Sequence, residues 1–381
     1  MTEATRLLRD LVALPSVNPM GRDLPAELIY EHRVTAYLER FFRDLGVPFE
    51  RQTIAPGRDN IVARCELPGA GKTLLFEAHQ DTVPVDGMTI DPFAARIEGN
   101  RLYGRGACDI KGGMAAMLAT FARLVKEKPR GAANLIMACT VDEEHTFLGV
   151  QELVKRGVKA DGAVVAEPTL LNIVHAHKGV ARWKLRTAGR SCHSSAPEQG
   201  INAIYRMGKV LTLIERFAEE LRGGRADPLL GPPTISVGRI EGGSSVNTVP
   251  DRCQIEIDRR IIPGERPEQT PRQLAEFLEN AGIDVPLEMT PLFINAPALS
   301  PKGVEDLVQR LGDAIDAVRG RHTVHPVPYG TDASTIADGG IPAVVFGPGN
   351  IAQAHTCDEW VPLDELEQAS EILYRLALTM S

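Results

Sequence analysis

The chain contains 381 residues, of which 43% are hydrophobic and 24% are charged, and its formal net charge is −8. A chain of this size buries a sizeable core and divides into two or three domains. The acidic balance without a basic stripe argues against nucleic-acid binding, and no apolar run is long enough to cross a membrane. No signal segment opens the sequence and none of the six cysteines forms a CxxC pair, so we expect a cytoplasmic protein with reduced thiols.

Short apolar segments alternate with amphipathic helices through the first part of the chain. This alternation is typical of an α/β protein with a mixed sheet that is buried on both faces. Helices are predicted over residues 28–45, 112–128 and 147–157, and strands over residues 60–67, 73–79, 133–141 and 161–168.

The pattern changes near Gly179, where strands with one polar and one apolar face begin. In segment 252–260, Cys253 and Ile255 alternate with polar residues, as in a strand with one exposed face. The helix predicted over residues 202–221 places Ile204 on its apolar face. We therefore predict a separate α+β unit over residues 179–293. Its other predicted elements are strands 181–189 and 234–240 and helix 270–282. The α/β pattern then resumes with helix 302–319, strand 342–349 and helix 363–380.

Side chains that bind metals follow several of the apolar segments. Ligands gather outside the carboxyl ends of strands in open α/β sheets, so we expect these side chains to converge. Two histidines with three or more carboxylates suit Zn²⁺, Mn²⁺ or Co²⁺. Each motif alone also fits a structural residue or a solvated acidic loop, so the prediction depends on their joint occurrence. The residues are His79 and Asp81, Asp109, Glu143 and Glu144, Glu167, and His355.

Nine motifs in family order between residues 79 and 360 carry a resemblance to a known family. They are HQDTVP, GRGACDIKGG, VDEEHTFLG, AEP, HSSAPEQGINAI, GGSSVNTVPD, DRRIIPGE, YGTDAS and AHTCDEW. The chain resembles the M20-type co-catalytic metallopeptidases and deacylases, which include acetylornithine deacetylase, succinyl-diaminopimelate desuccinylase, aminoacylase-1 and glutamate carboxypeptidase.

The resemblance implies a zinc-peptidase-like catalytic domain with an inserted lid. Residues 1–178 and 294–381 would form the catalytic domain, and residues 179–293 would form an α+β lid that also joins two copies into a homodimer. Two divalent metal ions are implied, with zinc preferred and cobalt or manganese as alternatives. Asp109 would bridge the two ions; His79 and Glu167 would complete one site, and Glu144 and His355 the other.

The resemblance also assigns roles around the metals. Asp81 would orient the imidazole of His79, and Glu143 would be the general base. His193 would reach the active site of the partner subunit and stabilise the oxyanion. Substrate-binding positions implied by the motifs are Asn247, Arg260 (preferred to Arg259), Thr331 and Gly347. The histidines that match no ligand position, expected to be structural, are His145, His175, His177, His322 and His325.

The function implied is hydrolysis of the amide bond of a small N-acyl amino acid. A metallo-carboxypeptidase or dipeptidase of the same family is the alternative. A binding protein that lost turnover, or an α/β protein whose acidic loops are merely solvated, are the other hypotheses. Relatives often have glycine where this chain has Thr146, and this difference concerns loop shape and substrate preference rather than the ligands.

Overall fold

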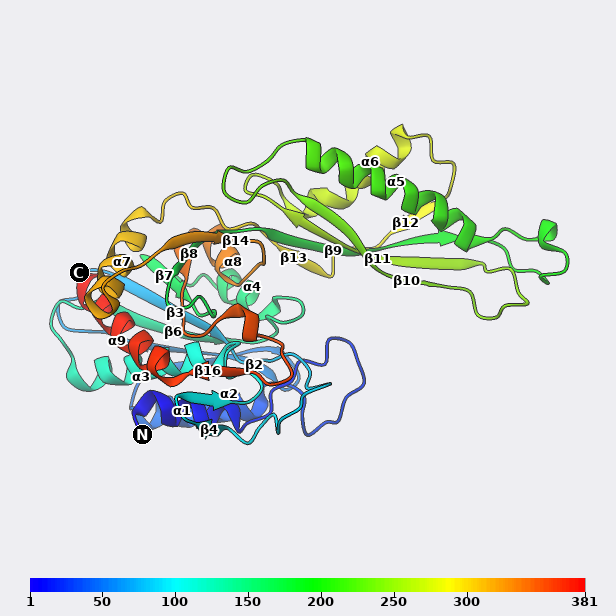
Figure 1. Ribbon diagram of the computed structural model, residues 1–381. Helices are drawn as coiled ribbons and strands as arrows, with labels where there is room; N and C mark the ends of the chain where they lie inside the picture. Colours follow the sequence, from blue (N-terminus) through cyan, green and yellow to red (C-terminus); the bar gives the residue numbers. More distant parts are fainter. Residues whose placement is uncertain (381) are drawn as a thin grey trace. The chain divides into compact units, whose positions relative to one another are not determined.

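The computed structural model describes residues 1–380, which form two compact units (Figure 1). The first unit contains residues Met1–Ala176, Ser300–Pro326 and those from Thr331 onward. The second contains His177–Leu299 and Val327–Gly330. The insert predicted over residues 179–293 therefore lies within the second unit.

Within residues 1–380, a mixed sheet of eight strands forms the centre of the first unit. Its strand order is β1-β2-β6-β3-β7-β15-β8-β14. Strands β6, β3, β7 and β15 are parallel neighbours, whereas β1, β2 and β8 pair antiparallel. This arrangement confirms the predicted α/β class. The strands are β1 (Phe49–Ala55), β2 (Arg58–Cys65), β3 (Thr73–His79), β6 (Asn134–Thr140), β7 (Gly162–Val165), β8 (Ile173–His177), β14 (Val324–Val327) and β15 (Ala343–Val345).

Helices pack against both faces of this sheet. Helices α1, α3, α7 and α9 form one connected group. Helix α2 contacts β1 and β2. Helices α4 and α8 pack against each other, with α4 on β1, β2 and β6 and α8 on β7 and β15. A small sheet in the order β16-β5-β4 joins the end of the chain to an early segment. The elements are α1 (Glu3–Val12), α2 (His32–Asp44), α3 (Lys111–Glu127), α4 (Leu148–Lys155), α7 (Glu305–Arg319), α8 (Ala333–Asp338), α9 (Leu363–Thr379), β4 (Arg96–Glu98), β5 (Arg101–Tyr103) and β16 (Trp360–Pro362).

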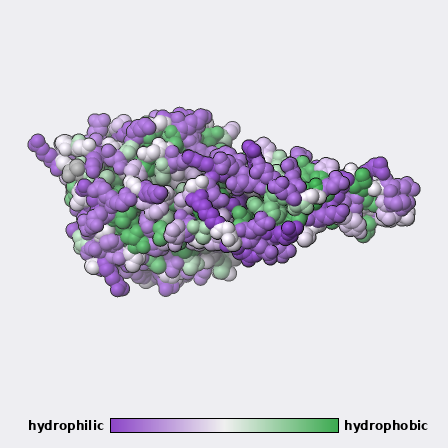
Figure 2. Space-filling view, turned by 90° about the horizontal axis from the view of Figure 1, so that it is seen from above, coloured by the Kyte–Doolittle hydropathy of each residue, from purple (hydrophilic) through white to green (hydrophobic). Residues whose placement is uncertain are grey.

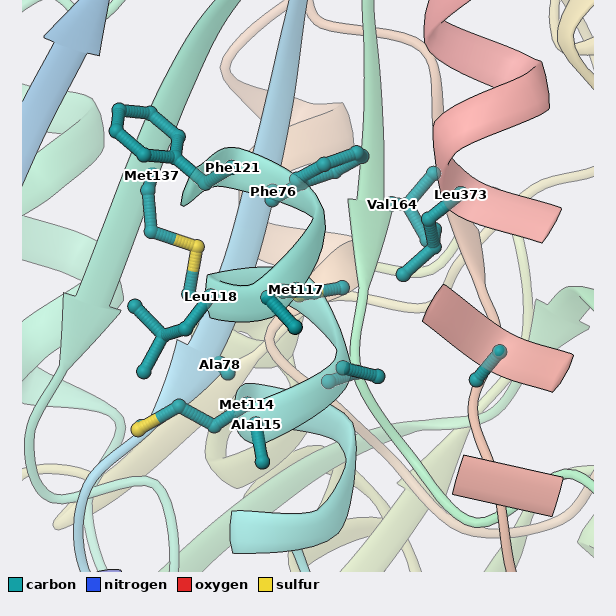
Figure 3. Close-up of a cluster of buried hydrophobic side chains, with 14 of the residues drawn as sticks. Phe76, Ala78, Met114, Ala115, Met117, Leu118, Phe121, Met137, Val164 and Leu373 are labelled. Atoms are coloured by element: carbon teal, nitrogen blue, oxygen red, sulfur yellow. The ribbon is translucent and has the colours of Figure 1, made fainter. Parts of the chain in front are cut away.

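Helix α3 carries the main core of this unit. Its Met114, Met117 and Phe121 form one buried cluster with Phe76 of β3 and Met137 of β6 (Figure 3). Full burial of each such side chain stabilises the fold by roughly 1.5–3 kcal/mol. The close packing fixes the parallel strands, and with them the strand ends that carry the candidate site.

The second unit is an antiparallel sheet with two helices. The strand order is β10-β11-β9-β12, with β13 also paired to β9. Trp183 of β9 and Ile255 of β11 lie in the apolar core between sheet and helices. The unit contains β9 (Gly179–Ala188), β10 (Thr234–Gly242), β11 (Arg252–Ile261), β12 (Leu287–Met289), β13 (Ile294–Ala296), α5 (Ala203–Gly223) and α6 (Thr270–Asn280).

Two local predictions were wrong. Ile204 is 40% exposed and its neighbour Ala203 is buried instead, but Met207, Ile214 and Phe217 on the same predicted face are buried, so the prediction fails only at the first turn of α5. Helix α2 begins at His32 rather than at residue 28. The preceding residues pair with Val17 instead, whose N–H donates to Leu28 (2.9 Å) and whose carbonyl accepts from Tyr30 (3.0 Å).

Hydrophilic residues predominate on the face seen in Figure 2, and the hydrophobic areas between them are small. This distribution agrees with the charged fraction of the sequence. No helix within residues 1–380 combines the length and apolarity that crossing a bilayer requires.

Candidate metal centre

The carboxyl ends of three adjacent parallel strands carry candidate ligands. His79 is the last residue of β3, β6 leads directly into the turn with Glu144, and β7 leads to Glu167. Asp109 lies in the loop before α3, and His355 lies just before β16. Because β6, β3 and β7 are parallel neighbours, their exits open at one edge of the sheet.

Asp109 lies between the two histidines. Its Oδ1 is 3.3 Å from Nε2 of His79, and its Oδ2 is 3.2 Å from Nε2 of His355. Oε2 of Glu144 is 3.3 Å from the same His355 nitrogen. Among the described residues, two groups offer ligand atoms within 4.8 Å of one another: His79, Asp109 and Glu167, and Asp109, Glu144 and His355. Asp109 belongs to both groups, one carboxylate oxygen facing each histidine.

The polar atoms of this cluster fit divalent cations. Within residues 1–380, Nε2 of His79 and Oε1 of Glu144 are buried and find no hydrogen-bond partner of acceptable geometry. Such unpaired buried atoms are costly unless a ligand satisfies them. Burial and the nearby Asp109 carboxylate raise the pKa of Glu144 to about 7, and the same two causes raise that of Glu167. Imidazole and carboxylate donors with excess negative charge suit two ions that share a carboxylate.

Asp81 contacts both His79 and the turn after β6 that carries Glu143 and Glu144, here called the acidic turn. Nδ1 of His79 bonds the main-chain carbonyl of Asp81 at 3.0 Å, and the Asp81 carboxylate is 3.5 Å from that nitrogen. The carboxylate accepts the main-chain N–H groups of Glu143 and Glu144, each at 3.2 Å, and the Asn18 amide at 2.8 Å. The carbonyl therefore sets the tautomer of His79, and the carboxylate fixes the turn that carries the base candidate.

Asp142, which precedes that turn, is held by three side-chain donors that the sequence did not predict. Its Oδ1 accepts from Asn18 Nδ2 (2.9 Å) and from Arg58 Nη1 (2.6 Å), and its other oxygen accepts from the Thr146 hydroxyl. Asp142 has a φ of 69°, in the left-handed region. Thr146, where relatives often have glycine, therefore contributes a side-chain hydrogen bond that closes this turn.

Thr331 and Gly347 belong to the same unit. The Thr331 hydroxyl accepts the N–H of Ala333 at 3.2 Å, at the start of α8. A Cβ at Gly347 would lie 2.6 Å from the carbonyl oxygen of Glu167, so only glycine allows this approach to the ligand segment. Gly347 thus has a packing role beside Glu167, and its role in substrate binding stays a prediction.

Comparison with known proteins decides the family. The family model described as peptidase family M20/M25/M40 matches residues 75–379. The chain belongs to this family. It is therefore a metal-dependent amidohydrolase or peptidase, as the motifs predicted.

Individual relatives of this M20 enzyme support the same assignment. An acetylornithine deacetylase from Myxococcus xanthus is 32% identical over 347 residues, covering 90% of this chain and 87% of the relative. An M20 family metallo-carboxypeptidase from Sulfolobus solfataricus has a TM-score of 0.80 at 22% identity, covering 100% and 99% of the two chains. A dinuclear metal-binding M20 peptidase from Bacillus subtilis has a TM-score of 0.70 at 18% identity, covering 98% and 96%. The two structural likenesses establish the fold.

His193 and Asn247 of this M20 enzyme lie together in the second unit. The main chain of His193 forms a bridge with Thr248, and the N–H of Ser194 donates to the carbonyl of Asn247 at 3.0 Å. The exposed imidazole of His193 bonds the hydroxyl of Ser195 through Nδ1 at 2.7 Å. The local fold therefore holds both candidate side chains on adjoining segments.

Arg260 is engaged with a carboxylate of its own strand. Its Nε donates to Asp258 at 2.8 Å, and Asp258 also accepts from Arg182 at 2.6 Å. Arg259, the less favoured candidate, is buried and bonds Glu265 at 2.9 Å. Arg260 thus already binds a carboxylate, the group it was predicted to bind in a substrate.

The remaining histidines have neighbours of other kinds, and none joins either ligand group within the described chain. His322 pairs with Asp316 at 2.8 Å, and Nδ1 of His175 approaches the carbonyl of His325 at 3.3 Å. Buried His177 bonds the carbonyl of Lys178 at 2.9 Å, and burial lowers its pKa to about 4.

Proposed function

We propose that this M20 metallohydrolase is a deacylase that cleaves the amide bond of small N-acyl amino acids, as acetylornithine deacetylase does. The observation that carries the proposal is the pair of ligand groups sharing Asp109 beside the buried carboxylate of Glu143. The 32% identity to an acetylornithine deacetylase over most of the chain supports a deacylase.

His79, Asp109 and Glu167 would hold one divalent ion, and Asp109, Glu144 and His355 the other. Such a pair would lower the pKa of a water molecule and polarise the amide carbonyl. We propose zinc as the metal because the donors are imidazole and carboxylate, with cobalt and manganese as alternatives.

Glu143 has the environment of a general base. It is buried beside the ligands without joining either ligand group of the described residues, and its N–H is fixed by Asp81 at 3.2 Å. Without bound metal, burial and the neighbouring carboxylates Glu167 and Glu144 raise the pKa of Glu143 well above the usual range. Glu143 takes the proton of the attacking water as the carbon–oxygen bond forms. It then gives that proton to the amine as the carbon–nitrogen bond breaks.

Residues of both units have the remaining proposed roles. We assign His193 to the oxyanion, delivered by a second copy of the chain in a homodimer formed through residues 179–293. Asn247, Arg260, Thr331 and Gly347 are assigned to the substrate. Arg260 would exchange the carboxylate of Asp258 for that of the substrate, while Asp258 keeps its bond to Arg182. The cytoplasmic location stays a prediction.

A hydrolysis panel tests the proposal. N-acetyl, N-succinyl and N-formyl amino acids, including N-acetylornithine, are compared with dipeptides in Zn²⁺, Co²⁺ and Mn²⁺. We expect an N-acyl amino acid to have the highest kcat/KM, and Glu143→Ala to lose about 10²–10⁴-fold in rate while keeping its metal. Faster cleavage of dipeptides would favour the peptidase alternative, and no hydrolysis of any substrate would favour a binding protein.

A further inference from the structure

A buried glutamate close to His355 contacts the loop that carries Asp109. The side chain of Glu359 is fully buried. Its Oε1 accepts the main-chain N–H groups of Cys108 (2.9 Å) and Asp109 (3.0 Å). Its Oε2 accepts the N–H of Gly106 (3.1 Å) and Nη1 of Arg105 (2.6 Å).

These bonds join three segments of the candidate centre. Arg105 also donates to the carbonyl of Pro84 at 3.2 Å, at the end of the motif that begins with His79. Glu359 itself leads into β16, whose Trp360 pairs with Tyr103 of β5. The carboxylate of Glu359 is therefore the point where the His79, Asp109 and His355 segments meet.

The loop is shaped to present its N–H groups to this carboxylate. Gly106 has a φ of +81°, and a Cβ there would lie 2.7 Å from Cγ2 of Thr82, so the loop path requires glycine. A charged acceptor of several N–H donors, shielded from water, makes short and strong hydrogen bonds. Fixing the N–H of Asp109 fixes the direction from which its side chain leaves the main chain.

We propose that Glu359 is a positioning residue that sets the distance between Asp109 and His355 and thereby controls the affinity of the enzyme for its pair of metal ions. The inference rests on the proposed two-metal function. Its physical basis is that one carboxylate binds the Asp109 loop while its own main chain carries the His355 segment. The 3.2 Å separation between Asp109 Oδ2 and His355 Nε2 follows from that connection.

Glu359→Gln tests this with little change in shape. A glutamine amide offers one acceptor oxygen and one NH₂ group. Whichever way it turns, the NH₂ group faces two of the donors that Glu359 binds, so those hydrogen bonds are lost. We expect a folded protein whose Zn²⁺ affinity, measured by competition with a chelating dye, falls about 10–100-fold. Amide hydrogen exchange of the metal-free variant should quicken at Cys108 and Asp109.

Glu265→Gln is the matched control. Glu265 also binds an arginine, Arg259 (2.9 Å), and a main-chain N–H, that of Ile262 (2.9 Å), but it lies in the second unit. The control should unfold at lower urea concentration and bind Zn²⁺ as the unchanged protein does. Equal loss of Zn²⁺ affinity in both variants, or none in Glu359→Gln, would overturn the proposal.

The experiment distinguishes failure of the two-metal function from failure of the positioning role of Glu359. Unchanged protein that binds no Zn²⁺ would contradict the two-metal function itself, whereas equal Zn²⁺ affinity of unchanged protein and Glu359→Gln would contradict only the positioning role. If Glu359→Gln does not fold, Glu359→Asp decides, because it keeps the charge but ends one methylene short of the donors. Its Zn²⁺ affinity should also fall, and unchanged affinity would overturn the proposal.

Discussion

Replacing Asn18 by alanine should destabilise the first unit and disturb the acidic turn together. The Asn18 amide is buried and donates to Asp81 (2.8 Å) and Asp142 (2.9 Å), and its oxygen accepts the N–H of Met20 (3.0 Å). A hydrogen bond to a charged group contributes about 1.5–3 kcal/mol and a neutral one about 1 kcal/mol. Asp142 keeps its bond to Arg58, so its lost hydrogen bond counts as only about 1 kcal/mol, and we expect a total loss of roughly 3.5–5 kcal/mol in the free energy of unfolding.

Urea unfolding of the metal-free protein measures this loss. The chain contains two tryptophans, Trp183 and Trp360, so a Trp183→Phe background leaves Trp360 to report on the first unit. Asn134→Ala is the control. It removes one hydrogen bond, in which the side-chain oxygen of Asn134 accepts the N–H of Leu67 (2.8 Å). This bond lies at the end of β6 opposite the acidic turn, and its loss should cost about 1 kcal/mol. If Asn18→Ala cost no more than this control, the proposed role of its two carboxylate bonds would be refuted.

Three further predictions concern metal, acid and the second unit. His355→Ala should lower the bound metal from two ions to about one per chain by elemental analysis, and an unchanged ratio would contradict its assignment as a ligand. The pKa of buried His177 is lowered to about 4 from 6.5, so the unfolded chain takes up its proton first, and its contribution to stability is complete above pH 6.5 and declines towards pH 4. Between pH 7 and pH 5 the free energy of unfolding, measured in urea, should therefore fall by about 2 kcal/mol less in His177→Asn than in unchanged protein. An equal fall in both proteins would refute the linkage. His193→Ala should reduce turnover without reducing metal content; failure of mixed His193→Ala and Glu143→Ala subunits to regain activity would count against delivery by a second copy.

The central strands and the clustered ligand residues could be predicted because their signals are local. Strands β3 and β6 are buried on both faces and read as continuous apolar runs. Histidine and carboxylate side chains directly after such strands have a distinctive chemistry, and the parallel arrangement brings His79 and Glu144 to one edge. Helix α1 could also have been predicted, because Thr2 is a typical N-cap residue and its side chain accepts the N–H of Thr5.

The supporting residues could not be predicted because their partners are distant in sequence. Asn18 reaches Asp81 across 63 positions, and Glu359 reaches Asp109 across 250. An isolated asparagine or glutamate carries no pattern that names such a partner, and only the folded chain brings them together. The exposure of Ile204 at the first turn of α5 has a similar origin, because tertiary packing decides which residues at the end of an apolar face are covered.

The order of strands in the large sheet also constrains when the enzyme becomes competent during its synthesis. Strand β15, from the last part of the chain, lies between β7 and β8, which are made much earlier. A nascent chain that has emerged only as far as β8 therefore has a gap in its sheet, and it still lacks His355 and Glu359. Synthesis must therefore reach the final segment before the proposed two-metal site is complete, and a prematurely terminated product carries only the early candidate ligands.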